Sequence, residues 1–358
     1  MGRRLGLRKR LGLELFSRLH AQTVERHELR TLFWECTLRC NLACRHCGSD
    51  CRTESLQPDM PAEDFFRVLD TQVTPHVDPH RVLVILSGGE VLVRRDLERI
   101  GLGLYRREYP WGMVSNGLAL DEWRFESLLR SGLHSLTISL DGFRDEHTYI
   151  RRNERSFDAA LAAAERAARE PSIATDVVTC VTPQLLPRIG EFRDMLVDRG
   201  IRAWRLFTIF PVGRAAADPR LQLSDEEFTR LMEFIAATRR EGRIAASYSC
   251  EGFLGGYEAE VRDSFYTCQA GVSIASIRVD GSISGCTSIR SNFHQGNIYT
   301  DDFWDVWTNR FDKFRNREWA RRGICADCGM FRYCLGNGMH LHGDDEELLL
   351  CHHRRLVR

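Results

Sequence analysis

The sequence predicts an α/β protein, with a partial (β/α)6 TIM-like barrel followed by a small cysteine-rich α+β C-terminal domain. Between residues 28 and 210, short apolar runs alternate with longer helix-patterned segments, which is typical of parallel strands joined by helical crossovers. After about residue 215 the pattern changes to short strand-like pieces and closely spaced cysteines. Six strands are too few for a closed eight-stranded barrel. We therefore expect an open barrel, with its chemistry at the carboxyl ends of the strands.

The expected strands and helices can be placed in order along the chain. The strands are predicted at 32–34, 82–86, 112–114, 135–140, 176–181 and 204–209. The helices between them are predicted near 61–74, 94–108, 121–131, 157–169 and 187–199. The later elements are a linker at 211–219, a helix near 224–240, short strands at 274–279 and 282–285, and a small helix near 301–308.

Residues 1–27 are predicted to form an N-terminal extension without a targeting role. Residues 1–27 are basic and amphipathic, and Glu14, Ser17 and Arg18 interrupt the apolar run in a way that fits a short helix better than a signal peptide. The chain also contains no run of about 18 apolar residues, so we expect no membrane span and a cytoplasmic location. The 50 basic and 50 acidic residues cancel and are interleaved, which argues against a nucleic-acid partner.

The chain contains thirteen cysteines, and most of them fall into two groups, between 36 and 51 and between 268 and 351. A cytoplasmic compartment keeps thiols reduced, so disulfides are a poor explanation for so many cysteines. Two groups of closely spaced thiols instead predict two metal-bearing regions.

The first group contains a C-x3-C-x2-C motif, which directly follows the first expected strand. Its three cysteines are Cys40, Cys44 and Cys47. Three thiolates on one tight loop can hold three irons of a 4Fe–4S cluster and leave the fourth iron open, as a catalytic metal requires. The alternative is a structural zinc site whose fourth ligand would be Cys36, Cys51 or His46.

This spacing at this place resembles the radical SAM superfamily, whose members use S-adenosylmethionine (SAM). The resemblance implies that Cys40, Cys44 and Cys47 hold the SAM-binding 4Fe–4S cluster, and that His46 packs beside it. It also implies that the open iron chelates SAM, and that an injected electron cleaves SAM to a 5′-deoxyadenosyl radical. On this interpretation, residues 28–215 form the radical SAM core.

Further motifs at the strand ends are similar to the SAM-binding residues of that family. Gly88-Gly89-Glu90 resembles the GGE motif that binds the SAM amino group, because glycines permit close backbone approach and a carboxylate accepts hydrogen bonds from an ammonium. An ordinary strand-to-helix turn is the alternative for these three residues. The other SAM contacts that the resemblance implies are Ser115, Asn116, Ser139, Asp141, Arg151 for the SAM carboxylate, and Leu206 for the adenine.

The second cysteine group resembles the SPASM extension of radical SAM enzymes that mature peptides and small proteins. Residues 216–358 would then be a linker helix and a SPASM domain. In that family the matching cysteines ligate an auxiliary 4Fe–4S cluster, and a zinc ribbon is the alternative here. The four residues at the matching positions are Cys325, Cys328, Cys334 and Cys351.

A further auxiliary cluster is implied by Cys268 and Cys286, but the pattern is incomplete. The extension usually has another cysteine four residues after the one at 334, where this chain has Gly338. Three alternatives follow from this difference. Either His340 or His342 replaces the cysteine, or Cys250 is recruited, or this cluster is absent.

The leading functional hypothesis is a radical SAM enzyme that abstracts hydrogen from a peptide or small-protein substrate. The alternatives are modification of a small molecule such as a tetrapyrrole, a non-catalytic iron–sulfur electron carrier or binding protein, and a zinc-binding interaction module. The resemblance further implies an electron donor such as flavodoxin or ferredoxin. Relatives with the ending Gly-Asn-Gly-Met-His suggest a lipoprotein partner. The sequence assigns no catalytic acid or base.

Overall fold

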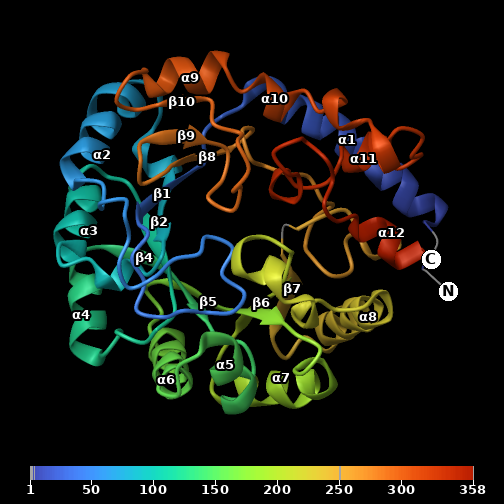
Figure 1. Cartoon of the computed structure of the whole chain (residues 1–358), viewed down its shortest axis with the longest axis horizontal. Coiled ribbons are helices and arrows are strands. Elements are labelled where there is room, and N and C mark those ends of the chain that lie inside the picture. Colours follow the sequence, from blue (N-terminus) through green and yellow to red (C-terminus); the bar gives the residue numbers. More distant parts are fainter. Residues whose placement is uncertain (1–2, 4, 250, 358) are drawn as a thin grey trace.

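The computed structural model describes residues 3, 5–249 and 251–357, and these residues form one curved ten-stranded sheet (Figure 1). The strand order is β10-β9-β8-β1-β2-β3-β4-β5-β6-β7, parallel from β8 to β7 and antiparallel at β9 and β10. The strands are β1 Thr31–Thr37, β2 Leu83–Gly88, β3 Trp111–Ser115, β4 Leu133–Ser139, β5 Ala174–Val181, β6 Ala203–Thr208, β7 Ala245–Tyr248, β8 Ile274–Ile277, β9 Ser282–Ser284 and β10 Gly296–Asn297.

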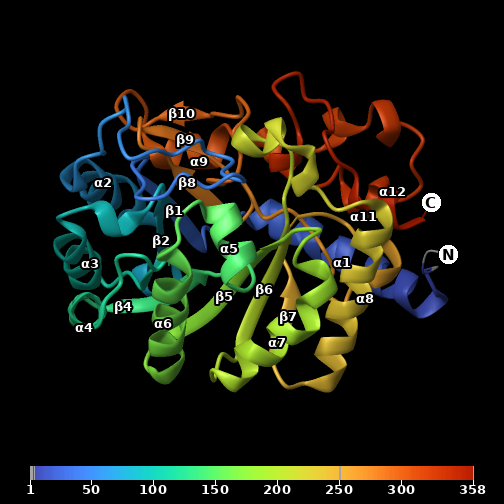
Figure 2. The ribbon, with the colours of Figure 1, turned by 60° about the horizontal axis from the view of Figure 1, so that its bottom comes forward.

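The helices surround this sheet. In Figure 1, α2 to α8 lie along its outer side, while α1 and α9 to α12 complete the ring. Figure 2 shows α5 to α8 on the same side of β4 to β7. The helices are α1 Leu7–Arg26, α2 Ala62–Val68, α3 Leu97–Arg106, α4 Glu122–Arg130, α5 Arg144–Arg151, α6 Ser156–Arg169, α7 Ile189–Asp198, α8 Asp225–Glu241, α9 Phe303–Asn309, α10 Asp312–Arg315, α11 Phe331–Cys334 and α12 His352–Val357.

The predicted open barrel is confirmed, and the sheet is larger than the sequence indicated. The six expected strands are β1 to β6, and all are parallel to their neighbours. β7 was not predicted, and it pairs in parallel with β6. The two expected short strands are β8 and β9, which form a hairpin at the other edge of the sheet, where β8 pairs in parallel with β1. The proposed division at residues 27, 215 and 216 stays a prediction.

The outer face of the sheet packs against the helices through aromatic side chains. Trp34 of β1 stacks on Phe65 of α2, with their ring centroids 4.2 Å apart. Trp204 of β6 meets Phe192 of α7 edge to face at 5.8 Å. Each of these four side chains is fully buried, and such burial contributes roughly 1.5–3 kcal/mol per large apolar side chain. This packing fixes which face of each strand turns toward the barrel interior.

The interior face carries polar side chains from neighbouring strands. Thr137 of β4 donates to Asp176 of β5 at 2.7 Å, and Arg205 of β6 donates to Thr137 at 2.8 Å. Side chains alternate along a strand, so Cys180 lies on the same face of β5 as Asp176, four residues further toward the carboxyl end. Chemistry-bearing residues at that end therefore point into the barrel.

The N-terminal extension forms a helix, α1, which is longer than the predicted one. Its Leu13 is buried against Phe253 and Tyr266, and its Lys9 pairs with Glu260 at 2.7 Å. The extension is thereby attached to the segment that precedes the second cysteine group. Among the helices of the described residues, none has the length and apolar character that a membrane crossing requires.

Candidate active site

The C-x3-C-x2-C motif lies on the loop between β1 and α2. Cys40 and Cys44 are buried and Cys47 is half-buried. The Cys40 backbone N–H donates to the carbonyl of Arg52 at 2.7 Å, which closes the loop on itself. Burial raises the pKa of Cys40, and the charges of Cys44 and Cys47 add to this effect, so the three thiols face a common region. The loop is therefore a compact thiol site at the carboxyl end of β1.

The segment predicted as a linker holds this loop from the other side. Arg214 follows β6, and its Nε donates to the carbonyl of Cys44 at 2.7 Å. Its backbone N–H donates to the carbonyl of Cys47 at 3.0 Å, and its Nη1 donates to the carbonyl of Cys51 at 2.9 Å. Sequence reasoning missed Arg214, because a linker composition gives no sign of such a contact. The residues after β6 are thus part of the site.

The donor set fits an iron–sulfur cluster better than a single zinc ion. Zinc binds thiolates at about 2.3 Å, so a tetrahedral zinc site brings its sulfurs to within about 4 Å of one another. Among the described residues, one set of three metal-binding side chains has ligand atoms within 4.8 Å of one another, and it contains none of Cys40, Cys44 and Cys47. Burial raises the pKa of Cys40 to about 12, so its thiolate needs a metal to stabilise it.

Gly88 and Gly89 bring the end of β2 against the end of β1. A Cβ atom on Gly88 would lie 2.0 Å from the carbonyl oxygen of Thr37, and one on Gly89 would lie 2.1 Å from that of Arg39. The Gly89 N–H donates to Thr37 O at 2.8 Å, and the Glu90 N–H donates to Arg39 O at 2.9 Å. The glycines therefore allow the close approach of two strand ends, in addition to any approach to a ligand.

Glu90 connects the ends of β2 and β3. Its buried carboxylate accepts hydrogen bonds from the Ser115 hydroxyl at 2.9 Å and from the Asn116 backbone N–H at 2.7 Å. Burial raises the pKa of Glu90, and these hydrogen bonds oppose the shift. The Asn116 amide lies 4.0 Å from Cys40 Sγ and donates to Asn41 at 2.8 Å. Three of the predicted SAM contacts are thus joined to the thiol loop.

Asp141 and Arg151 form a buried pair beside the second cysteine of the motif. Arg151 Nε donates to Asp141 Oδ2 at 2.6 Å, and Arg151 Nη1 lies 3.8 Å from Cys44 Sγ. The other oxygen of Asp141 accepts the backbone N–H of Cys180 at 2.8 Å. Burial works against the charge of Asp141, but Arg151 outweighs it and lowers the pKa of the carboxyl group. A fixed cation therefore lies next to the thiol loop.

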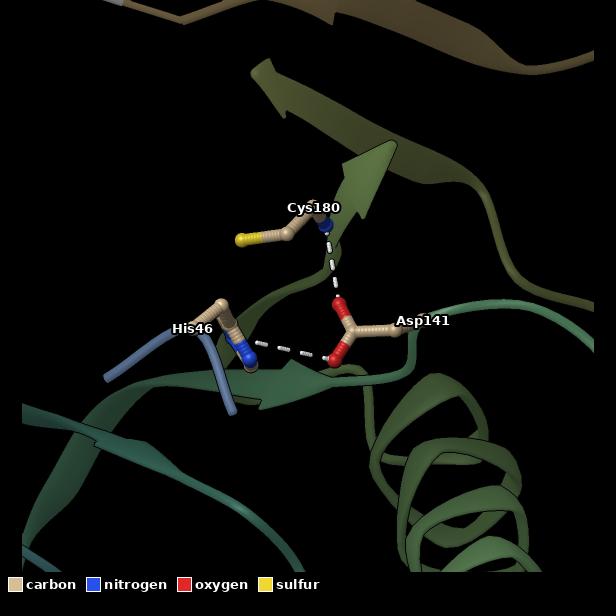
Figure 3. Close-up of side chains that lie close together, drawn as sticks. All are labelled: His46, Asp141 and Cys180. Carbon is tan, nitrogen blue, oxygen red and sulfur yellow. Dashed lines mark hydrogen bonds and ion pairs between the residues drawn. The ribbon is translucent and has the colours of Figure 1, made fainter. Parts of the chain in front are cut away.

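His46 lies on the thiol loop and faces the carboxylate of Asp141. Figure 3 shows His46, Asp141 and Cys180 converging, with His46 Nε2 4.0 Å from Asp141 Oδ2. Burial, followed by the charge of Arg151, lowers the pKa of His46 to about 4. The imidazole is therefore neutral at physiological pH. Its Nδ1 is buried, without a hydrogen-bond partner in the part of the chain that the structure describes.

Two other predicted SAM contacts, Ser139 and Leu206, lie in strands β4 and β6. Ser139 is buried at the last position of β4, opposite Val178 of β5. Leu206 is buried in the middle of β6, and its backbone carbonyl accepts a hydrogen bond from the Ser249 N–H at 3.0 Å. The SAM contacts of Ser139 and Leu206 stay predictions.

The second cysteine group also comes together in the fold. Burial raises the pKa of Cys334, and the charges of Cys351, Cys325 and Cys328 add to this effect. Burial likewise raises the pKa of Cys325 to about 11. The Asn337 backbone N–H donates to Cys334 Sγ at 3.2 Å, as amides commonly do toward cluster sulfurs. Four buried or half-buried thiols from three short segments suit a fully ligated cluster.

The third set, Cys268 and Cys286, lies at the start and the end of the β8–β9 hairpin. The two segments are adjacent, because a Cβ atom on Gly285 would lie 3.0 Å from Cβ of Ala270. Both thiols are half-buried. The alternative ligand Cys250 lies outside the described residues.

Comparisons with known proteins identify the family. Residues 34–196 match the model of the radical SAM superfamily, and residues 268–329 match that of SPASM, an iron–sulfur cluster-binding domain. Together the two models cover well over half of the chain. The chain belongs to the radical SAM superfamily and carries a C-terminal SPASM domain, as predicted. It is an enzyme whose cofactors are a SAM-binding 4Fe–4S cluster, auxiliary clusters and SAM, which sets aside the electron-carrier and zinc-module alternatives.

The relatives and the similar structures differ in substrate. An AdoMet-dependent heme synthase from Oleidesulfovibrio alaskensis is 25% identical over 86% of this chain and 82% of its own length. The mycofactocin maturase MftC from Mycolicibacterium smegmatis is 28% identical over 88% and 81%. Streptococcus suis SuiB bound to S-adenosylmethionine has the same fold, with a TM-score of 0.68, 19% identity and coverage of 89% and 76%. For anSMEcpe with bound AdoMet and the Cp18Cys peptide, these values are 0.69, 18%, 92% and 93%.

Proposed function

We propose that this enzyme cleaves SAM reductively and abstracts hydrogen from a peptide or small-protein substrate, which it thereby modifies. The observation that supports this most strongly is the thiol loop of Cys40, Cys44 and Cys47, joined to the ends of neighbouring strands through Asn116 and Arg151. SAM bound at the open iron of such a cluster supplies a 5′-deoxyadenosyl radical when one electron is injected.

The surrounding residues would bind and orient SAM. Glu90 would accept hydrogen bonds from the SAM ammonium, and Arg151 would attract its carboxylate. His46, neutral and buried, offers a flat ring for the adenine side of the site. These residues are held by each other and by the strands, so the site is preorganised before SAM arrives.

A peptide substrate is favoured over a tetrapyrrole by the charges at the β1 side of the barrel. The C-terminal region presents Arg278 and Arg290 to this side, but Arg290 already pairs with the fully buried Glu35 at 2.7 Å and Arg278 lies 3.6 Å from it. The propionate groups of a tetrapyrrole require free cations, whereas backbone amides of a peptide do not. The relatives include both kinds of enzyme, so our choice of a peptide rests on this pairing.

The test uses enzyme reconstituted anaerobically with iron and sulfide, and measures 5′-deoxyadenosine formed from SAM and dithionite. We expect a library of short synthetic peptides to raise the yield and to contain modified products by mass spectrometry. Iron coproporphyrin III should leave the yield unchanged and should itself remain intact. Its conversion to another porphyrin would overturn the peptide assignment, and the absence of any 5′-deoxyadenosine would overturn the SAM chemistry.

We further propose that His340 replaces the missing cysteine at 338 as a ligand of the cluster held by Cys268 and Cys286. A Cβ atom on Gly338 would lie 2.7 Å from Cε1 and 2.8 Å from Nδ1 of His340. The imidazole therefore fills the space that a cysteine side chain at position 338 would need. A neutral imidazole has one nitrogen with a lone pair, which can bind iron.

His342, the other candidate, is less suitable. Its Nε2 lies 2.6 Å from the carbonyl oxygen of Gly336, and its Nδ1 lies 3.1 Å from that of Glu346. Both nitrogens are therefore engaged with the backbone, and a metal bond would break one of these contacts. His342 also packs against Trp319, with ring centroids 4.9 Å apart, which fits a structural role.

Reductive cleavage of SAM requires an electron donor, and a peptide substrate requires a source. A flavodoxin or a ferredoxin would supply the low-potential electron, and a lipoprotein is our proposed source of the peptide. A cytoplasmic location agrees with such an electron donor and with the oxygen sensitivity of an open cluster. Stimulation of 5′-deoxyadenosine formation by purified flavodoxin and its reductase, in place of dithionite, would test the donor.

A further inference from the structure

The further feature is a thiol that no motif of the family explains. Cys180 is the next-to-last residue of β5 and is half-buried, with its side chain on the interior face of the barrel. Its Sγ lies within 4.8 Å of a ring nitrogen of His46 and of a carboxylate oxygen of Asp141. Figure 3 shows the three side chains around the Asp141 carboxylate, with His46 beside one oxygen and the Cys180 backbone N–H bonded to the other.

A metal ion is a poor explanation for this group of three. Asp141 already accepts hydrogen bonds on both oxygens, from Arg151 at 2.6 Å and from the Cys180 backbone at 2.8 Å. A cation placed among His46, Asp141 and Cys180 would lie close to the buried guanidinium of Arg151. Like charges in a dry interior repel strongly. The arrangement therefore suits a neutral thiol better than a metal ligand.

A chain of contacts links the Cys180 thiol to the loop that carries the cluster cysteines. Arg151 lies 3.8 Å from the sulfur of the cluster residue Cys44 and bonds to Asp141, which in turn holds the backbone of Cys180. His46 belongs to the cluster loop itself. Cys180 is thus three contacts away from a cluster ligand, with Asp141 and Arg151 between them, on the face where SAM would lie.

We propose that the Cys180 thiol is a hydrogen-atom donor to carbon radicals formed in this barrel, an inference that rests on the proposed SAM chemistry. The S–H bond breaks and a C–H bond forms on the radical carbon, which leaves a thiyl radical on Cys180. One electron from a reduced auxiliary iron–sulfur cluster, or from dithionite in the test, and one solvent proton restore the thiol. An ordinary cysteine is largely protonated at neutral pH. Burial, followed by Asp141, raises the pKa of Cys180 further.

The interior location distinguishes Cys180 from another buried thiol at a strand end. Cys36 of β1 is fully buried, and its Sγ lies 3.6 Å from the carbonyl oxygen of Ser87. Its neighbour Trp34, two residues earlier on the same face, stacks on a helix. Cys36 therefore faces the helices, and it serves as the matched control.

The test needs no knowledge of the substrate. Reconstituted enzyme in D2O is supplied with SAM and dithionite alone, and the 5′-deoxyadenosine is analysed by mass spectrometry. A thiol exchanges its hydrogen with solvent, whereas a carbon-bound hydrogen does not. We expect one deuterium in most of the 5′-deoxyadenosine from wild type and from Cys36→Ala. The label should be lost from Cys180→Ser, because an O–H bond is too strong to donate to a carbon radical.

A second variant and a binding measurement keep the interpretation clear. Cys180→Ala should behave as Cys180→Ser does, and both should retain the iron content and the SAM affinity of wild type in equilibrium binding. Unchanged deuterium in either variant would overturn the assignment of Cys180. Unlabelled 5′-deoxyadenosine from wild type would overturn it as well. Failure to form any 5′-deoxyadenosine would instead overturn the proposed SAM chemistry.

Discussion

The two cysteine regions of this enzyme are built on different supports. At the barrel, the thiol loop is joined to strand ends by hydrogen bonds that need no metal, such as those from Ser115 and Asn116 to Glu90. In the C-terminal region, Cys325 and Cys334 lie in short helical turns of three and four residues. Regular structure therefore shapes the first site, whereas we expect the second to depend on the metal that it would bind.

The most drastic change is removal of the barrel cluster. Cys40→Ala/Cys44→Ala/Cys47→Ala should lose about four irons per chain and all 5′-deoxyadenosine formation. Since the strand ends hold the loop, the thermal unfolding temperature should stay close to that of wild type. Iron analysis, a 5′-deoxyadenosine assay and circular dichroism check these outcomes. A large loss of helix signal would contradict the metal-independent support of this site.

The corresponding change in the C-terminal region should remove local structure as well as iron. Cys325→Ala/Cys351→Ala should also lose about four irons, but with a marked loss of local structure. Limited proteolysis should then cut the region after residue 322, which stays intact in the barrel triple variant. Equal protease resistance of the two variants would show that the C-terminal region holds its shape without iron.

The same contrast explains how much could be predicted from the sequence. The strands of the barrel were found because apolar runs and helix patterns alternate over local distances. β7 was missed because its sequence, Ala-Ala-Ser-Tyr, is short and weakly apolar. The parallel pairing of β8 with β1 joins residues about 240 positions apart, which no local pattern reports.

The site was predicted to a similar extent. The spacing of Cys40, Cys44 and Cys47 and the strand-end motifs indicated the cluster and its surroundings. Arg214 was missed because its contacts depend on a loop packing against another loop. Cys180 could have been found from the sequence, because the period of two places it on the interior face at the end of a predicted strand. The choice of His340 over His342 required the folded chain.

A smaller effect distinguishes the two histidines of the C-terminal region. His340→Ala should lower the iron content from about twelve to about eight per chain, because one cluster loses a ligand. His342→Ala should keep about twelve irons but lower the free energy of unfolding by roughly 1–3 kcal/mol, since the buried carbonyl of Gly336 loses the imidazole beside it. Iron analysis and chemical denaturation of both variants check this. If His340→Ala retains all its iron, the missing cysteine has another substitute or none.

The smallest expected effect tests the metal-free support of the barrel site. Glu90→Gln keeps the size of the side chain but removes a charge that three protein donors share, from Ser115, Asn116 and Leu92. In the glutamine side chain an NH2 group replaces one carboxylate oxygen and faces a hydrogen-bond donor. One buried donor therefore loses its acceptor, and the free energy of unfolding should fall by about 1–3 kcal/mol.

SAM affinity should fall together with stability in this variant. Loss of the charged acceptor for the SAM ammonium should weaken binding by about tenfold, or about 1.4 kcal/mol, in equilibrium dialysis. Glu63→Gln is the control, because Glu63 is exposed at the start of α2 and pairs with Arg99 on the surface. Iron content should be unchanged in both variants. If Glu90→Gln loses stability but binds SAM normally, Glu90 only joins strands β2 and β3, and its resemblance to the SAM-binding motif is structural.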